Sequence, residues 1–463
     1  MDSAIVMGSG VAGILAAEVL SRHCGNVTMI ERDRLDGSER DRPGVPQHRH
    51  VHILWPAGQN ILESLFPGAM ESLHGLGAPR ISFPADARWL STEGWLPRLP
   101  LTKVFTCSRS LLEATLRKRL TKVDVRDNTT VTDLLTDATG RVVGVRTRSG
   151  DQTQTMHADL VVDATGRSSK LSQWLAALGH TLPTETVVDA QMGHATQDFR
   201  IPQEYTPNFT AVALQHRPPH VRRCAYMFLQ ENGHWRCTLA GYGADYPPNT
   251  NEGFLEYART LRDPTLHSLL TKATPVGRIA AFRQAANRHH HWEKMRTWPA
   301  GLVALGDSAC AFNPVYGHGM SVSALCAQAL ERWLANGAAS TAEFQRAAAR
   351  AASGAWSIAT WEDWRCRETT GARPTIKDRI LLTYYVRVLT AATMDSTVCA
   401  DLMNVMSLLK KPRALMRPDV VLRVMRKSRG GCCQVAGEAD HPLPEAIHRT
   451  RDLPAHRPHE AGD

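Results

Sequence analysis

Three glycines near the N-terminus, Gly8, Gly10 and Gly13, have the spacing of a turn that binds phosphate. They follow a short apolar run at residues 3–7 and lead into an apolar stretch that predicts a helix. The first glycine permits a tight turn, the second lets the backbone approach a pyrophosphate, and the third lets the helix pack closely on the strand. The free N–H groups and the positive end of the helix dipole would then face the negative charge.

A carboxylate ends the next predicted strand. Glu31 follows the apolar residues 26–30 and lies 18 positions after Gly13, where it can accept hydrogen bonds from both ribose hydroxyls of an adenosine. A glycine-rich turn in an ordinary α/β unit would not require an acidic residue at that strand end. The combination predicts a dinucleotide-binding domain.

Three later segments bear on which dinucleotide binds, because the same glycine turn serves several. A predicted strand at 158–162 leads into Asp163, and a buried strand at 301–305 leads into Gly306 and Asp307. Directly afterwards, residues 313–320 contain a Pro-x-x-Gly turn and open a helix that is expected to extend to about residue 334. Free N–H groups at the start of that helix would stabilise a negatively charged group of a ligand.

Together these segments resemble the class A flavoprotein monooxygenases, the family with the p-hydroxybenzoate hydroxylase fold, over about residues 1–345. The resemblance implies FAD as cofactor, with Asp307 on the ribityl chain and the Pro-x-x-Gly turn against the pyrimidine end of the isoalloxazine. Arg109 matches an arginine that contacts FAD in the family, although a solvated arginine at a helix end is the alternative. The residues expected to contact the cofactor are Gly8, Gly10, Val11, Ala12, Gly13, Glu31, Arg32, Arg42, Gly44, Arg109, Asp163, Gly306, Asp307, Pro314, Gly317, Gly319 and Met320.

A second run of residues narrows the resemblance. The loop at 42–47 reads Arg-Pro-Gly-Val-Pro-Gln, His50 and His52 follow it, and residues 65–68 read Leu-Phe-Pro-Gly. This residue pattern resembles that of the family branch containing flavin epoxidases that act on polyene precursors of polyether antibiotics such as monensin and lasalocid. We expect the two histidines to hydrogen-bond within the loop, while Arg42 is positioned to contact FAD or the phosphates of the reductant.

The resemblance implies a reaction. NADPH or NADH reduces the flavin, O₂ adds at flavin C4a to give the hydroperoxide, and one oxygen passes to an alkene of a hydrophobic polyketide or terpenoid intermediate. Alkene epoxidation requires no catalytic acid or base, so none is assigned. Phenol hydroxylation by the same family, a prenyl-chain reductase, and a flavoprotein that only binds or cyclises its substrate remain alternatives. A halogenase is disfavoured because the Trp-x-Trp-x-Ile-Pro signature is absent from the sequence.

The remaining patterns predict an α/β chain: a Rossmann-like FAD-binding domain with a parallel sheet and helices, an antiparallel-sheet substrate domain and a C-terminal helical region. Alternating apolar residues between about 187 and 283 indicate the antiparallel sheet, and Tyr226, Phe228, Trp235 and Thr238 are candidates for one wall of the substrate cavity. The expected boundaries are 1–75, 101–183 and 284–341 for the FAD-binding domain, 76–100 and 184–283 for the substrate domain, 342–429 for a helical cap and 430–463 for a mobile tail.

Composition excludes several classes of protein. Hydrophobic residues make up 43% and charged residues 21% of the 463 residues, as in ordinary globular enzymes. The net charge of +9 comes from scattered basic residues, which argues against nucleic-acid binding, and no apolar run reaches the length of a membrane span. Ten dispersed cysteines favour a reduced, cytoplasmic protein. Residues 289–291 are three histidines, but adjacent side chains rarely point at one centre and no carboxylate spacing supports them, so no metal is expected.

Overall fold

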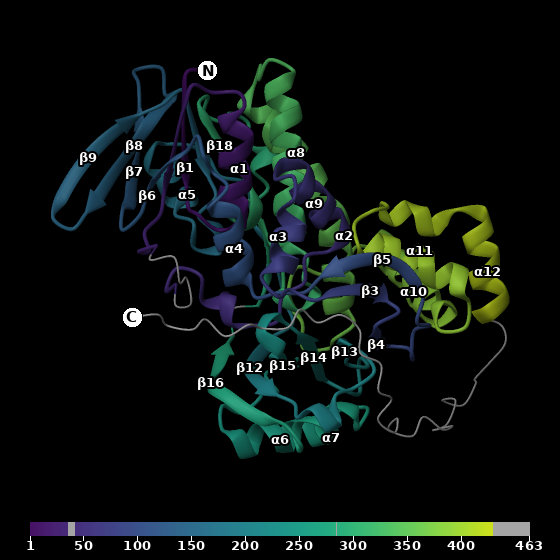
Figure 1. Cartoon of the computed structure of the whole chain (residues 1–463). Coiled ribbons are helices and arrows are strands. Elements are labelled where there is room, and N and C mark those ends of the chain that lie inside the picture. Colours follow the sequence, from purple (N-terminus) through teal and green to yellow (C-terminus); the bar gives the residue numbers. More distant parts are fainter. Residues whose placement is uncertain (36–41, 284, 429–463) are drawn as a thin grey trace, which may run out of the picture.

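The computed structural model describes residues 1–35, 42–283 and 285–428 (Figure 1). Its first layer is a five-stranded, all-parallel sheet in the order β18-β10-β1-β2-β6. The strands of this sheet are β1 (Ser3–Met7), β2 (Asn26–Ile30), β6 (Asp124–Arg126), β10 (Leu160–Asp163) and β18 (Leu302–Ala304). Four segments far apart in the sequence therefore meet in one sheet, and the loops after β1, β10 and β18 lie at one edge.

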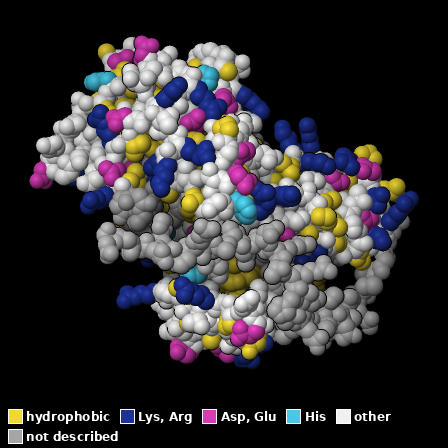
Figure 2. All heavy atoms as spheres, viewed as in Figure 1, with side chains coloured by type: hydrophobic (Ala, Val, Ile, Leu, Met, Phe, Trp, Pro, Cys, Tyr) yellow, Lys and Arg dark blue, Asp and Glu magenta, His cyan; other side chains and the backbone are white. Residues whose placement is uncertain are grey.

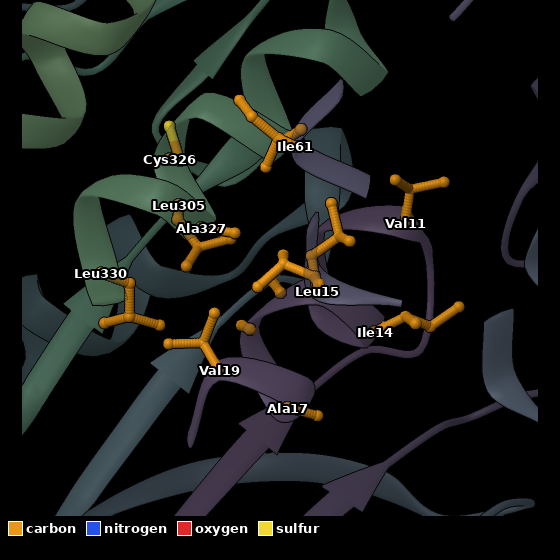
Figure 3. Close-up of a cluster of buried hydrophobic side chains, with 14 of the residues drawn as sticks. Val11, Ile14, Leu15, Ala17, Val19, Ile61, Leu305, Cys326, Ala327 and Leu330 are labelled. Atoms are coloured by element: carbon orange, nitrogen blue, oxygen red, sulfur yellow. The ribbon is translucent and has the colours of Figure 1, made fainter. Parts of the chain in front are cut away.

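Helices cover one face of this sheet. Helix α1 (Val11–Ser21) is apolar on most sides because it lies between β1 and the long helix α8 (Gly319–Ala335), and Figure 3 shows Val19 of α1 beside Leu330 of α8. Small residues such as Ala16 and Ala17 let the elements approach closely. The opposite face packs on α5 (Leu171–Ala177) and on a three-stranded antiparallel sheet, whose strands are β7 (Thr130–Thr136), β8 (Val142–Ser149) and β9 (Gln152–His157).

The second layer is a six-stranded sheet in the order β16-β12-β15-β14-β13-β4, drawn in the lower half of Figure 1. All neighbours are antiparallel except β4 and β13. Its strands are β4 (Ala87–Leu90), β12 (Gly193–Arg200), β13 (Ala211–Leu214), β14 (Arg223–Leu229), β15 (Trp235–Gly241) and β16 (Thr274–Phe282). Helices α6 (Asn251–Arg259) and α7 (Thr265–Leu270) cover one face, and Ala211 and Phe228 on the other face pack with Trp55 and the C-terminal helices.

Smaller elements connect the two layers. Strands β3 (Arg80–Pro84) and β5 (Pro100–Phe105) pair with each other, and a four-stranded sheet has the order β19-β17-β11-β20. The strands of the latter are β11 (Thr186–Asp189), β17 (Asn287–His289), β19 (Cys310–Ala311) and β20 (Thr370–Gly371). Helices α2 (Pro56–Leu65), α3 (Ala69–Gly75) and α4 (Arg109–Arg117) lie beside α1 and α8.

The C-terminal helices are α9 (Thr341–Trp364), α10 (Ile376–Ala392), α11 (Ser396–Met406) and α12 (Pro418–Ser428). The expected cap at 342–429 begins too early: Phe344, Ala348 and Ala355 of α9 are buried in the same core as α1 and α8, because an alanine-rich helix can pack closely on its neighbours. Only the last turns of α9 join α10–α12 in a second core. The predicted tail at 430–463 lies outside the described residues.

Two observations concern the surface and the helices. Lys and Arg side chains are spread over the face in Figure 2 rather than gathered in one stripe. Among the described residues, no helix combines the length and the hydropathy that crossing a bilayer requires.

Candidate functional site

The glycine turn after β1 has the geometry that its spacing predicts. Gly8 has a φ of +97°, and a Cβ on it would lie 2.7 Å from the carbonyl oxygen of Ala164. A Cβ on Gly13 would lie 1.9 Å from the carbonyl oxygen of Gly8, so only glycine allows this packing. A Cβ on Gly10 would meet only the Arg109 and Glu113 side chains, at 3.4 and 3.8 Å. Gly10 therefore faces the space in front of the helix.

Helix α1 begins at Val11, and no side chain of the described residues caps its N-terminus. A helix start carries several backbone N–H groups without an intrahelical acceptor, and together with the dipole they favour an anion there. The turn and the uncapped helix thus form a cradle for a diphosphate.

A buried network of charged side chains surrounds this cradle. Arg42 donates to the Oε2 atoms of Glu31 and Glu113 at 2.6 Å each, and all three side chains are almost inaccessible to solvent. Glu31, at the end of β2, also accepts hydrogen bonds from the Ser9 N–H at 2.9 Å and hydroxyl at 2.7 Å. Glu31 is therefore at the expected strand end, and Arg42 joins it across the mouth of the glycine turn.

Glu113 is the member of this network that the sequence analysis missed. Its Oε1 accepts from Arg109 Nε at 2.7 Å, and its Oε2 lies 3.9 Å from Arg117. Burial alone would raise the pKa of Glu113, but Arg109 and Arg42 hold that pKa below its usual range. The i, i+4 spacing of Arg109, Glu113 and Arg117 on one predicted helix is the signal that could have revealed it.

The second motif lies against the first. Gly306 follows β18 with a φ of +66°, and a Cβ on it would lie 2.9 Å from the Cβ of Ala12 on α1. Asp307 is the next residue. Burial raises the pKa of Asp307, and the positive charges of Arg167 and Arg109 oppose that rise. Arg109 therefore acts electrostatically on Asp307 while its guanidinium reaches the glycine turn.

Three other predicted residues have supporting positions. The carboxylate of Asp163 is fully buried and accepts from the Thr165 N–H at 2.9 Å and hydroxyl at 2.6 Å, so it holds the loop after β10. The Gly44 N–H donates to the Asp33 carboxylate at 2.9–3.0 Å, and the exposed Arg32 donates to the Gly44 carbonyl at 3.1 Å. These bonds fix the two loops that carry Asp163, Arg32 and Gly44, and the expected contact of these residues with the cofactor stays a prediction.

The Pro-x-x-Gly turn forms a short 3₁₀ helix (Pro314–Tyr316) ahead of α8. Gly317 has a φ of +65°, and a Cβ on it would lie 2.4 Å from Ile53. A Cβ on Gly319 would approach Asp307 Oδ1 at 3.5 Å, and Met320 is buried in the first turn of α8. The turn thus connects the Asp307 motif to the space beside it.

That space is a cavity, partly open to solvent, between the six-stranded sheet, the turn at 314–318 and the helices α9–α11, and its empty volume is about 990 Å³ when the open space at its mouth is included. A second, smaller cavity of about 330 Å³ lies beside Arg109, Met320 and His52. The walls of the larger cavity are mainly apolar and aromatic, and include Trp55, Trp89, Tyr226, Phe228, Tyr385 and Leu402.

The sheet contributes one face to this cavity, as period-two alternation requires. Tyr226 and Thr238, which are paired across β14 and β15, line it together with Phe228. Trp235, a fourth candidate, has the opposite parity and packs against Phe209 on the far side of the sheet. The wall prediction is therefore confirmed for three residues and wrong for Trp235.

The cavity is lined by titratable groups that the sequence did not place there. His50 and His194 line it, and burial lowers the pKa of His50 to about 2 and that of His194 to about 4. His50 bonds to Thr196 at 2.7 Å. Glu362 of α9 lines the opposite wall, where burial raises its pKa although Arg365 lies 3.1 Å away. Their separate positions in the sequence gave no common signal.

Behind the turn, Asp363 accepts hydrogen bonds from Tyr316 at 2.6 Å and Asn287 at 2.6 Å, and Asn313 lies 3.2 Å away. Burial raises the pKa of Asp363 to about 8, although the hydrogen bonds from Tyr316 and Asn313 oppose this. The network ties α9 to the turn, so a cavity wall and the expected cofactor turn are mechanically joined.

The histidine run contradicts the expected geometry. His289 and His291 point to one side, and Glu293 lies with them, so that one ligand atom of each residue is within 4.8 Å of the others. Only His290 points away, stacked on Trp292. Strand β17 ends at His289, and the left-handed backbone of His291 (φ +56°) turns the chain so that His291 and Glu293 lie beside His289.

The site as a whole fits FAD. A diphosphate at the uncapped start of α1 and a polyol chain beside Asp307 would be close together, because Gly306, which precedes Asp307, packs against Ala12 so closely that a Cβ on it would lie 2.9 Å from the Ala12 Cβ. FAD carries both groups in one molecule, and its ring system would extend from Asp307 toward the turn at 314–318 and the cavity. The site therefore consists, in order, of the glycine turn with the start of α1, the carboxylate of Asp307 and the mainly apolar cavity.

Comparisons with known proteins agree with this geometry. The sequence pattern of the FAD binding domain family matches residues 2–361. Protein Rv3254 of Mycobacterium tuberculosis is 33% identical over 348 residues, which cover 72% of this chain and 73% of that protein.

Solved structures share the fold at low sequence identity. The flavin-dependent brominase Bmp2 superposes with a TM-score of 0.65 at 14% identity, over 92% of this chain and 99% of Bmp2. PqsL from Pseudomonas aeruginosa, described as a probable FAD-dependent monooxygenase, gives 0.58 at 14% identity, over 87% of this chain and 99% of PqsL. The myxobacterial chondrochloren halogenase CndH gives 0.61 at 16% identity, over 88% and 97%. The chain therefore belongs to the FAD binding domain family, and it has the fold that flavin-dependent halogenases and monooxygenases share.

Proposed function

We propose that this protein is an FAD-dependent monooxygenase that uses NADPH or NADH and O₂ to epoxidise an alkene of a hydrophobic polyketide or terpenoid intermediate. When bound, FAD supplies the electron transfer and oxygen activation. The observation that carries the proposal is the large apolar cavity beside the turn at 314–318, on the side of the fold where the FAD ring is expected. Residues 1–75, 101–183 and 284–341 would form the FAD-binding domain, with α9 added from the expected cap.

The residues around the glycine turn would bind the cofactor. Gly10 and the start of α1 would hold the diphosphate, Glu31 the ribose, and Asp307 the ribityl chain. Arg109 would neutralise negative charge between the diphosphate and Asp307, because its guanidinium lies beside Gly10 and its positive charge opposes the rise in the pKa of Asp307. Arg42 and Glu113 would fix the position of Arg109 rather than transfer any group.

The cavity residues would orient the substrate and exclude water. Aromatic walls such as Trp55, Trp89 and Phe228 suit a flat, apolar, unsaturated chain. The histidines of the cavity are held neutral and are weak bases, since burial lowers the pKa of His50 to about 2 and of His194 to about 4. This supports oxygen transfer to a neutral alkene, which needs no base.

Glu362 favours a second candidate, the hydroxylation of a phenol. It is a buried carboxyl group in the cavity wall, and burial raises its pKa, which improves its ability to take a proton near neutral pH. A phenol substrate would give its proton to Glu362 as the ring attacks the oxidant. The two candidates thus differ in whether Glu362 is needed.

The test is product analysis under ¹⁸O₂. The FAD-loaded protein is incubated with NADPH or NADH and with panels of terpenoid polyenes and of phenols, and products are examined by mass spectrometry. The proposal expects one ¹⁸O atom in an epoxide and substrate-stimulated oxidation of the reductant. A saturated product without ¹⁸O would indicate a reductase, a halogenated product in the presence of bromide or chloride would indicate a halogenase, and either would refute the proposal.

Glu362→Gln separates epoxidation from hydroxylation. This variant keeps the size of the side chain but cannot accept a proton. We expect kcat/KM for an alkene to change by less than about threefold, and kcat/KM for a phenol to fall by about 100-fold or more if Glu362 is the base. Equal losses with both substrate classes, at unchanged FAD content, would contradict both assignments.

A further inference from the structure

Three side chains converge between β17 and the short 3₁₀ helix that follows it (Trp292–Lys294). His291 Nδ1 lies 3.0 Å from Glu293 Oε1, and His289 Nε2 lies 3.6 Å from Glu293 Oε2. His291 has a φ of +56°, a left-handed conformation that is unusual for a histidine. The backbone bend at His291 is what brings Glu293 back toward the two rings.

The spacing of these atoms suits a metal ion. A cation bound at 2.0–2.2 Å from each of three ligands in a tetrahedral or octahedral arrangement places the ligand atoms about 3.0–3.6 Å apart. Each carboxylate oxygen of Glu293 faces one histidine, Oε1 at 3.0 Å from His291 and Oε2 at 3.6 Å from His289, and one ligand atom of each residue lies within 4.8 Å of the others. Only a small movement of the histidines would be needed to complete the geometry.

Neighbouring groups orient the ligands. Thr186 Oγ1 lies 2.7 Å from His291 Nε2, so that a proton on Nε2 leaves the lone pair on Nδ1 for the cluster. The His289 ring packs at 4.0 Å from the His291 ring and 5.3 Å from Trp356 of α9. The three side chains remain 13–19% exposed, so an ion can enter from solvent.

The charges around the cluster also fit a cation. Glu293 supplies one negative charge, and both histidines can be neutral ligands. Arg288, which precedes His289, pairs with Glu185 at 3.2 Å, and His290 lies 3.7 Å from the same carboxylate. The positive charge next to the cluster in the sequence is therefore paired with a carboxylate outside the cluster.

We propose that His289, His291 and Glu293 bind a divalent cation of the borderline class, such as Zn²⁺. Two imidazoles and one carboxylate are the donors that Zn²⁺, Co²⁺ and Ni²⁺ accept, whereas Mg²⁺ and Ca²⁺ prefer oxygen ligands. Solvent would complete the coordination. The ion would join β17 and the 3₁₀ helix against Thr186 and Trp356, which stabilises the four-stranded sheet behind Asn287. This revises the expectation that the chain binds no metal, and it does not depend on the proposed oxidation reaction.

The experiment is a titration of the metal-stripped, FAD-loaded full-length protein with ZnCl₂, followed by calorimetry and by competition with a chromogenic chelator. Co²⁺ in place of Zn²⁺ reports ligand geometry through its visible absorption. We expect one saturable equivalent that raises the thermal midpoint of unfolding, and at least about a 10-fold loss of affinity in His291→Ala and Glu293→Gln.

His290→Ala is the matched control, because it removes a histidine from the same run whose ring stacks on Trp292 at 4.9 Å and faces away from the cluster. This variant should keep the full Zn²⁺ affinity. Retained FAD content and near-ultraviolet circular dichroism establish that each variant is folded. No saturable binding, binding that survives His291→Ala, or an equal loss in His290→Ala would overturn the proposal.

Discussion

The two ends of the site differ in how they treat charge. Around the glycine turn, the buried Arg42 pairs at 2.6 Å with both Glu31 and Glu113, and neighbouring arginines hold the pKa of Glu113 below its usual range. Around the cavity, burial lowers the pKa of His50 and His194 and raises that of Glu362, so the same desolvation favours neutral forms. The difference teaches that burial alone does not set ionisation. Neighbouring arginines outweigh the effect of burial on the pKa of Glu113 beside the glycine turn, whereas burial outweighs the charge of Arg365 at Glu362 in the cavity wall.

The largest loss of folding and of FAD binding is expected for a substitution in the glycine turn after β1. In Gly13→Val, the Cβ would lie 1.9 Å from the carbonyl oxygen of Gly8, which belongs to rigid backbone. Helix α1 would have to move away from β1, so we expect loss of FAD binding and little folded protein, measured by released FAD and circular dichroism.

Gly10→Ala is the matched control for that substitution. Its Cβ would meet only side chains, at 3.4 and 3.8 Å, so the fold should survive while FAD affinity falls at least about 10-fold because the diphosphate cannot approach. Unchanged FAD affinity in folded Gly10→Ala would contradict a diphosphate at this turn.

The next effect tests the buried charges. Glu113→Ala would leave Arg42 and Arg109 without the carboxylate that both contact. Removing one partner of a buried ion pair costs about 3–5 kcal/mol, so we expect that loss in the free energy of unfolding by denaturant titration. Glu71→Ala breaks an exposed pair with Arg80 and should change stability little. Similar losses in both variants would remove the distinction between buried and surface charge.

A smaller effect tests the neutral side of the comparison. His216 is buried and stacks on Tyr242 at 4.0 Å, and neither ring nitrogen has a hydrogen-bond partner within the described part of the chain. Burial lowers the pKa of His216 to about 3. Below about pH 6.5 the unfolded chain takes up a proton that the folded chain refuses, so this stability is present above pH 6.5 and is lost toward pH 3.

His216→Phe keeps the stacked ring and removes the titration. We expect a gain of about 1 kcal/mol at pH 7 and a shallower loss of stability between pH 6.5 and 4, measured by denaturant unfolding across that range. His23→Gln, on an exposed turn, should leave the acid limb unchanged. An unaltered acid limb in His216→Phe would show that this residue does not contribute to it.

The sequence predicted the geometry of the glycine turn and of Glu31 better than that of the cavity. Gly8, Gly13 and Glu31 lie within one strand–turn–helix–strand unit, so short-range spacing carries the geometry. The parallel and antiparallel sheets were also foreseeable from periodicity. The cavity could not be, because His50, His194 and Glu362 come from a loop, a strand and a helix that meet only through tertiary packing.

Two expectations failed for different physical reasons. The cap does not start at 342 because alanine-rich packing of α9 on the first core leaves no signal in amphipathic periodicity. The histidine run was not expected to converge because adjacent side chains rarely point at one centre, and the left-handed backbone at His291 that brings the side chains together leaves no pattern in the sequence.

The most direct test of the central claim is an absorbance spectrum of the purified protein, with chromatographic identification of the cofactor released on denaturation, followed by dithionite and then air. The account predicts about one equivalent of FAD per chain, with oxidised bands that bleach on reduction and return with oxygen. A folded protein that does not bind FAD at concentrations that saturate another protein of the family would contradict the assignment of the glycine turn and Asp307 to one cofactor.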